Sequence, residues 1–218
     1  MAGGGTGLAL TAAMSALRRE HGFTLVDLLV VMALIGIVAA MAVPMSENTA
    51  RTFRLKGDAQ AVANMVSLAK MRASARYSRT RIRADLAANS FRMEVWTPTA
   101  VADKFVGSWV TDGPTVPLSR GVTFGIAGRA TPPANTQTVI GQSPACTAQD
   151  SLDTDPQANT ACIVFNSRGI PIDTAGQPMG GNALYISDGL TVYATTITAT
   201  PLVRQWMAHG ATGEWLKQ

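Results

Sequence analysis

The chain has few of the residues on which most protein chemistry depends. Its 218 residues include only two cysteines and two histidines, which excludes a disulfide-dense scaffold and a cysteine-based metal cluster. Charged residues make up 15% of the chain, against roughly 25% in an average soluble protein, so a disordered polyelectrolyte and a long coiled coil are both disfavoured. No Gly-x-Ser-x-Gly, His-Glu-x-x-His or P-loop pattern follows residue 22. We therefore expect neither an enzyme nor a bound metal or cofactor.

The formal net charge of +4 is unevenly distributed along the chain. Residues 51–92 contain ten lysines or arginines and two aspartates, whereas residues 93–218 contain six basic and nine acidic residues. Because the basic character is local, it does not predict a general nucleic-acid-binding surface. A solvated helix face is the simpler interpretation of the basic segment. Contact with anionic lipid headgroups, a partner or DNA is the alternative.

Residues 23–43 form one long apolar run, FTLVDLLVVMALIGIVAAMAV, in which only Thr24 and Asp27 are polar. As a helix rising about 1.5 Å per residue, this run would be about 31 Å long, which is enough to cross a bilayer once. Arg18 and Arg19 precede it, which predicts a cytoplasmic N-terminal side and export of the rest. We therefore expect this run to cross a membrane once, with its N-terminal side in the cytoplasm and the rest of the chain delivered outside.

Three interpretations of this run compete. The small residues of Ala40-Met41-Ala42 fit a secretory cleavage site that would release a soluble binding protein after Ala42. A plain membrane anchor is the second interpretation, and the processed helix of a pilin-like subunit is the third. Asp27 argues against the first two, because an ionised carboxylate at a helix centre costs roughly 2.5–3.5 kcal/mol on membrane insertion scales.

The segment GFTLVDLLVV at residues 22–31 resembles the prepilin processing motif of type IV pilins and type II secretion pseudopilins. The resemblance implies that a prepilin peptidase cuts between Gly22 and Phe23, removes residues 1–22 as a cytoplasmic leader, and methylates Phe23. The family usually has glutamate where this chain has Asp27. By resemblance, Asp27 pairs with the amine of a neighbouring subunit and sets the register of assembly. The alternative is that Asp27 only stabilises the first helical turn, where the helix dipole favours a carboxylate.

Residues 44–78 continue the helix with an amphipathic pattern. Pro44 should kink or loosen the helix without ending it, so we expect one helix over residues 23–77. Its buried face is predicted from apolar residues recurring in steps of three and four, and three further apolar residues widen the stripe. The stripe consists of Leu55, Ala59, Val62, Val66, Ala69 and Ala73, widened by Ala61, Met65 and Leu68.

Residues 79–218 have the sequence pattern of a β-rich globular domain, in which β-branched runs are separated by turn residues. Turns over residues 85–90 and 187–189 predict two hairpins. The fold class is therefore α+β, with a long N-terminal helix packed on an antiparallel β-sheet domain, as in pilins. The expected strands are 80–84, 91–96, 106–110, 122–126, 161–165, 183–186, 190–197 and 202–207.

The segments IVFNSRG at residues 163–169 and VRQW at residues 203–206 resemble minor pseudopilins of the general secretion pathway H (GspH) and FimT type. This narrower resemblance implies a structural subunit of a type II secretion pseudopilus, with other pseudopilins and an inner-membrane assembly platform as partners. A minor pilin of a type IV pilus is the alternative. Some FimT-like proteins bind DNA through a Gly-Arg-x-Arg element. Residues 201–204 keep only its last arginine, Arg204, so no nucleic-acid partner is expected.

Cys146 and Cys162 lie sixteen positions apart, and a disulfide between them can form if the chain is exported. Between them, Asp150, Asp153 and Asp155 offer oxygen ligands that suit Ca²⁺, but their spacing is not that of an EF-hand. A solvated, disulfide-closed loop is the preferred interpretation. His209 has no cysteine or carboxylate at ligand spacing and is expected to be an isolated, exposed side chain.

Overall fold

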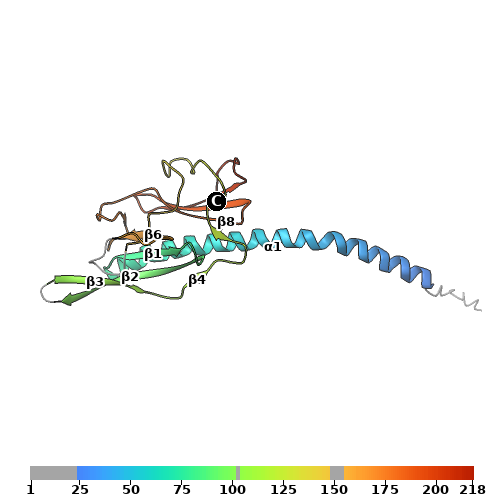
Figure 1. The fold of residues 1–218 in the computed structure, drawn as a ribbon, viewed down its shortest axis with the longest axis horizontal. Coiled ribbons are helices and arrows are strands. Elements are labelled where there is room, and N and C mark those ends of the chain that lie inside the picture. The colour runs from blue at the N-terminus through green and yellow to red at the C-terminus, as the bar shows by residue number, and fades with distance from the viewer. Residues whose placement is uncertain (1–23, 102–103, 148–154) are drawn as a thin grey trace, which may run out of the picture. The chain divides into compact units, whose positions relative to one another are not determined.

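The computed structural model describes residues 24–101, 104–147 and 155–218. The chain divides into two compact units, Met1–Met45 and Ser46–Gln218. Helix α1 (Leu25–Arg76) contains 52 residues and continues through Pro44. The predicted single helix is confirmed over this range, and the strands all follow it in the chain (Figure 1).

Helix α1 ends where the backbone turns left-handed. Tyr77 has a φ of 50°, and the amide of Ser78 donates a hydrogen bond of 3.3 Å to the carbonyl of Ala73. This bond from the second residue beyond the helix to its last turn is the Schellman arrangement, which satisfies a terminal carbonyl. The chain is thereby turned directly into the first strand, β1 (Thr80–Asp85).

The first sheet has six strands and carries the first predicted hairpin. β1 pairs antiparallel with β2 (Ser90–Val101), and Asp85 lies opposite Ser90. In the turn between them, a carboxylate oxygen of Asp85 accepts hydrogen bonds from the amides of Ala87 and Ala88. The order is β3-β2-β1-β6-β7, with β4 pairing β2. The remaining strands are β3 (Lys104–Thr111), β4 (Val116–Pro117), β6 (Thr160–Phe165) and β7 (Pro171–Ile172).

The second sheet has five strands in the order β11-β10-β9-β8-β5. Its β8–β9 hairpin, with Ser187 opposite Val192, confirms the turn predicted at residues 187–189. Asp188 caps this turn by accepting hydrogen bonds from the amides of Leu190 and Thr191. The strands are β5 (Thr123–Phe124), β8 (Asn182–Ser187), β9 (Thr191–Ile197), β10 (Val203–His209) and β11 (Leu216–Lys217).

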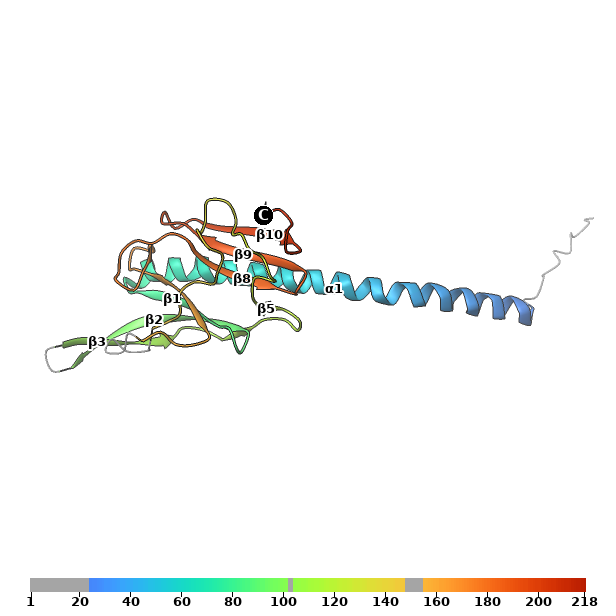
Figure 2. The same ribbon diagram turned by 45° about the horizontal axis from the view of Figure 1, so that its top comes forward.

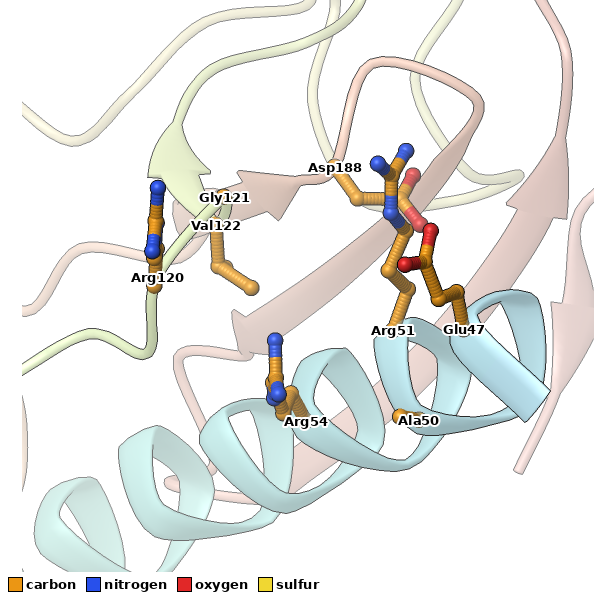
Figure 3. Close-up of a pocket in the computed structure, with 8 residues that line it drawn as sticks. All are labelled: Glu47, Ala50, Arg51, Arg54, Arg120, Gly121, Val122 and Asp188. Atoms are coloured by element: carbon orange, nitrogen blue, oxygen red, sulfur yellow. The ribbon is translucent and has the colours of Figure 1, made fainter. Parts of the chain in front are cut away.

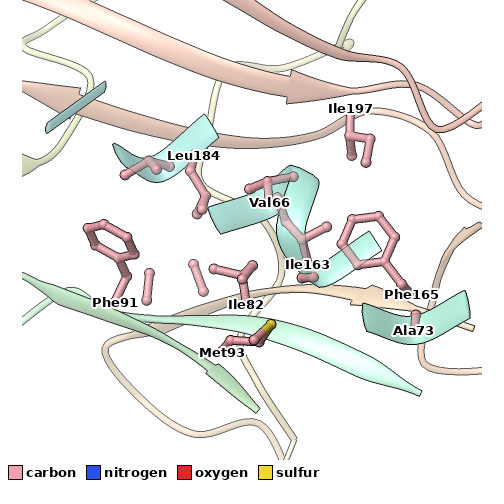
Figure 4. Packing of buried hydrophobic residues seen from close by; sticks show 13 residues of the cluster. Val66, Ala73, Ile82, Phe91, Met93, Ile163, Phe165, Leu184 and Ile197 are labelled. Atoms are coloured by element: carbon pink, nitrogen blue, oxygen red, sulfur yellow. The ribbon is translucent and has the colours of Figure 1, made fainter. Parts of the chain in front are cut away.

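The second half of α1 lies between the two sheets (Figures 1 and 2). Within Ser46–Gln218, Val66 of this helix packs in one cluster with Ile82 and Ile163 of the first sheet and with Leu184 and Ile197 of the second (Figure 4). All six residues of the predicted stripe, from Leu55 to Ala73, are buried. The helix therefore supplies the central layer of the core, and each sheet covers one side of it.

Three sequence predictions differ from the structure in detail. Leu68, expected to widen the buried stripe, is 41% exposed. The strand expected at residues 122–126 is reduced to Thr123–Phe124. The strands β4, β7 and β11 were not predicted, because a two-residue strand is too short to show an alternating pattern.

Candidate functional site

The beginning of α1 is held by two residues that hydrogen-bond each other reciprocally. The carboxylate oxygen Oδ2 of Asp27 accepts bonds from the Thr24 amide at 3.1 Å and from the Thr24 hydroxyl at 2.8 Å. The Thr24 hydroxyl oxygen in turn accepts a bond of 3.2 Å from the Asp27 amide. Thr24 is thus the N-cap residue and Asp27 stands three positions later, which is the geometry of a capping box. This agrees with the simpler interpretation of Asp27, as a group that stabilises the first helical turn.

The capping role leaves Asp27 chemically available for a second partner. Both hydrogen bonds that its carboxylate accepts from Thr24 go to Oδ2, and the side chain is exposed. An ionised carboxylate has about four lone-pair positions on two oxygens, so it can cap the helix and accept a hydrogen bond from an ammonium group together. The two predicted processing residues, Gly22 and Phe23, lie outside the described residues.

The helical turns around and after Asp27 present large apolar side chains to the surroundings on every side. From Leu25 to Val38 these side chains are 45–75% exposed. An apolar surface of this extent marks a site that another surface or a lipid phase covers. No helix within residues 24–101, 104–147 and 155–218 is long and apolar enough to cross a membrane. The transmembrane role expected for residues 23–43 stays a prediction.

Comparison with protein families identifies one feature of the chain. Residues 17–43 match the prokaryotic N-terminal methylation motif. This motif supports a type IV pilin-like protein. Its match covers Gly22, Phe23 and Asp27, three of the residues selected from the sequence. No curated protein and no solved structure matches the chain.

The two cysteines are joined in the structure. The Sγ atoms of Cys146 and Cys162 are 2.04 Å apart, and Cys162 lies on β6 opposite Arg83 of β1. The amide of Cys162 also donates a 2.8 Å hydrogen bond to the carbonyl of Pro144. The disulfide therefore fastens the segment before β6 to the first sheet. Asp150 and Asp153 lie outside the described residues, and Asp155 is exposed.

The face of the first sheet that points away from α1 carries a buried ion pair that the sequence did not reveal. Arg81 and Glu94 are 1% and 0% exposed, and the guanidinium Nε of Arg81 lies 2.6 Å from the Glu94 carboxylate. Arg92 pairs with the other carboxylate oxygen at 2.8 Å. Burial lowers the pKa of Arg81, and the charge of Glu94 opposes that shift. Alternation along the strand predicts Arg81 on a solvated face.

The arginines of α1 fall into two groups. Near the end of the helix, Arg72 and Arg76 form ion pairs of 3.1 and 3.4 Å with Asp112, which follows β3. These two arginines belong to a contact between the helix and the first sheet. Further back, Arg51 and Arg54 are exposed and line a pocket. Arg51 and Arg54 therefore agree with the predicted solvated basic face, whereas Arg72 and Arg76 depart from it through their ion pairs with Asp112.

Three other residues named in the sequence predictions lie in a turn or on a strand of the globular unit. The side-chain oxygen of Asn166 accepts hydrogen bonds from the amides of Arg168 and Ile170, so the segment after β6 is a side-chain-stabilised turn. Arg204 lies half-buried on β10. His209 is exposed, with its Nδ1 3.0 Å from the hydroxyl of Thr191, which is consistent with the expected isolated histidine.

Proposed function

We propose that this chain is a minor pseudopilin, a structural subunit of a type II secretion pseudopilus of the GspH and FimT type. In this proposal it is made as an inner-membrane precursor, cut between Gly22 and Phe23, and assembled with other pseudopilins by an inner-membrane platform. Its role is structural and not enzymatic: it helps to move folded proteins across the outer membrane from the periplasm.

The observation that carries the proposal is the methylation motif, residues 17–43, which overlaps the exposed apolar beginning of helix α1. A secretory signal cut after Ala42 would interrupt α1 about one third of the way along its length from Leu25 to Arg76. A plain anchor would have no use for the carboxylate of Asp27 inside an apolar run. A subunit that packs beside similar helices accounts for both features.

Asp27 acts in two ways in this proposal. Within its own chain it caps α1 through Thr24. Between chains, its other carboxylate oxygen, Oδ1, accepts a hydrogen bond from the amine that cleavage creates on Phe23 of a neighbouring subunit. Because aspartate is one methylene shorter than the usual glutamate, the two helix ends must approach more closely. Loss of either charge would leave its partner unpaired in apolar surroundings, which is costly.

The first test is the N-terminus of the mature protein purified from bacterial membranes. We expect N-terminal sequencing and intact mass to identify Phe23, with the mass of one added methyl group. Replacing Gly22 with a bulky residue, as in Gly22→Trp, should leave an uncut precursor. A mature chain beginning at Val43 would establish the soluble secreted protein instead. A chain that keeps Met1 would count against any processed subunit.

The second test separates the two roles of Asp27. The Asp27→Ala variant should be cleaved normally but co-assemble poorly with other pilins, because it lacks the charge that fixes register. The matched variant is Asp27→Glu, which keeps the charge and completes a standard capping box, and it should assemble at least as well as the unchanged chain. Normal assembly of Asp27→Ala, measured by co-purification from membranes, would contradict the register role.

The alternative function is a minor pilin that primes a type IV pilus. The same motif and the same helix support it equally well. Deleting the gene separates the two: loss of secreted protein with intact pili supports the pseudopilin, and loss of pili with intact secretion supports the minor pilin.

A further inference from the structure

A charged pocket opens between α1, the segment before β5 and the β8–β9 turn, all within Ser46–Gln218. It has a volume of about 610 Å³, and its charged lining residues are Glu47, Arg51, Arg54, Arg120 and Asp188. Figure 3 shows Arg54 and Arg120 toward one end, where Val122 lies between them, and Glu47, Arg51 and Asp188 toward the other. The pocket therefore has an end with two cations and an end with two carboxylates and one cation.

The arginines of this pocket differ from four others in the chain, which are engaged in ion pairs. Arg72, Arg76, Arg81 and Arg92 each form an ion pair with Asp112 or Glu94. Among the described residues, no ion pair involves Arg51, Arg54 or Arg120, and all three are exposed. Three guanidinium groups from two separate segments thus converge on one pocket while their donors remain available. Such a group of guanidiniums is suited to a phosphate, which it can bind through parallel N–H donors.

The two carboxylates indicate that the ligand also carries a positive charge. At one end of the pocket, Glu47 and Asp188 exceed Arg51 by one negative charge, and at the other end Arg54 and Arg120 are uncompensated. A ligand with an anionic phosphate and a cationic amine complements both ends. A simple anion would meet repulsion from Glu47 and Asp188.

The chain position of the pocket points to the source of such a ligand. Glu47, Arg51 and Arg54 follow the apolar run of residues 23–43 within eleven residues. In the proposed function, that run is inserted in a phospholipid bilayer before assembly. Lipid headgroups are therefore the phosphate-bearing groups close to this part of the chain, and those with an ethanolamine carry a primary ammonium beside the phosphate.

We propose that this pocket binds the phosphoethanolamine headgroup of a membrane phospholipid. Arg54 and Arg120 bind the phosphate, while Glu47 and Asp188 bind the ammonium group. The lipid assignment rests on the proposed membrane-inserted precursor, whereas the match of the pocket to a phosphate–ammonium pair rests on the residues alone. Occupation of the pocket would couple the globular unit to the bilayer surface until the subunit leaves the membrane.

The first experiment measures binding of the soluble headgroup, glycerophosphoethanolamine, to the full chain in a phosphate-free maltoside detergent by calorimetry. The double variant Arg54→Gln/Arg120→Gln should bind it at least about tenfold more weakly, because two charged hydrogen-bond donors are lost. The control is Lys56→Gln, which removes one positive charge from the same helix outside the pocket and should leave binding unchanged. Glu47→Gln with Asp188→Asn should remove the preference over glycerophosphoglycerol. Asparagine keeps the oxygen that caps the turn after Asp188.

The second experiment identifies the source of the phosphate. The full chain is extracted from bilayers containing phosphatidylethanolamine and phosphatidylglycerol, and its retained lipids are counted by native mass spectrometry. We expect phosphatidylethanolamine to be retained and to be lost in the arginine double variant but not in Lys56→Gln. Inorganic phosphate binding as tightly as the headgroup, or equal lipid retention by all variants, would overturn the lipid assignment.

A third outcome would also overturn the lipid assignment. If the full chain binds no headgroup and the arginine double variant fails to co-assemble with other pilins, the pocket is a protein-docking surface. None of these measurements depends on cleavage after Gly22, so failure of this inference and failure of the proposed function give different results.

Discussion

The buried phenol of Tyr185 makes the stability of the second sheet depend on pH. Tyr185 on β8 is fully buried, and its hydroxyl donates a 2.6 Å hydrogen bond to the side-chain oxygen of Gln137. Burial raises the pKa of this phenol far above its usual value of about 10, because the ionised form would lose its hydration. Burial also raises the pKa of Tyr193. Both phenols therefore favour the folded state only while they remain protonated.

We expect the free energy of unfolding to fall as pH rises above about 10. The folded-state pKa is raised, so the stabilisation is complete below the pKa of the unfolded chain and is lost as pH rises past it. In urea denaturation between pH 8 and 11, Tyr185→Phe should lose stability less steeply than the unchanged protein. The control is Tyr77→Phe, which removes the hydroxyl of an exposed tyrosine and should keep the original slope. Identical slopes in all three proteins would contradict the assignment.

At the scale of the elements, the contact between α1 and the turn after β6 depends on one glycine. Gly169 has a φ of +73°, and a Cβ placed there would lie 2.9 Å from the hydroxyl oxygen of Ser74 and 3.1 Å from the backbone carbonyl oxygen of Lys70. The positive φ disfavours any residue with a side chain. The close carbonyl adds a steric cost, because helix backbone cannot move aside as a flexible side chain can.

We expect Gly169→Ala to lower the free energy of unfolding by about 2–3 kcal/mol, of which about 1–2 kcal/mol comes from the left-handed backbone. The matched control is Gly176→Ala, which has a φ of +79° and no atom within 4 Å of the added Cβ. It should show the backbone cost alone. Equal losses in the two variants, measured by urea denaturation, would mean that the turn does not press against α1.

The elements also show how far the sequence alone determines this fold. The buried face of α1 and the two hairpins were predictable, because both depend on local periodicity and on turn residues. The division of the strands into two sheets was not, since it depends on which strands pair across long stretches of chain. The burial of Arg81 was missed for the same reason: a distant segment covers a strand face that alternation assigns to solvent.

The candidate site also has a part that is readable from the local sequence and a part that is not. Residues 22–31 carry the processing motif as a continuous string, so Gly22, Phe23 and Asp27 could be selected directly. The charged pocket joins α1 to Arg120 and Asp188, which are separated from Arg54 by 66 and 134 positions in the chain. No local pattern marks such a group. Only the packing of α1 against the second sheet brings it together.

At the scale of the whole molecule, the disulfide between Cys146 and Cys162 lies near the buried ion pair of Arg81 and Glu94. Two residues that lie between the bonded cysteines in the chain contact the outer face of the first sheet. The carbonyl of Thr147 accepts a 3.1 Å hydrogen bond from Arg81, and the side-chain oxygen of Gln157 accepts one from Arg83. Thr147 and Gln157 therefore help to cover the sheet face that carries the Arg81–Glu94 pair.

We expect reduction of the disulfide to lower the free energy of unfolding by about 3 kcal/mol, because the unfolded chain gains conformational entropy when a loop of this length is released. The decrease should be somewhat larger if the segment also leaves the sheet, because water would then reach the Arg81–Glu94 pair and the hydrogen bond from Arg81 to the Thr147 carbonyl would break. Urea denaturation with and without dithiothreitol measures the first effect, and hydrogen exchange at the β1 amides measures the second.

The Cys146→Ser/Cys162→Ser double variant serves as the control: it should resemble the reduced protein and show no response to dithiothreitol. Unchanged stability on reduction would mean that the packing on β1 and β6, and not the covalent bond, holds this segment in place.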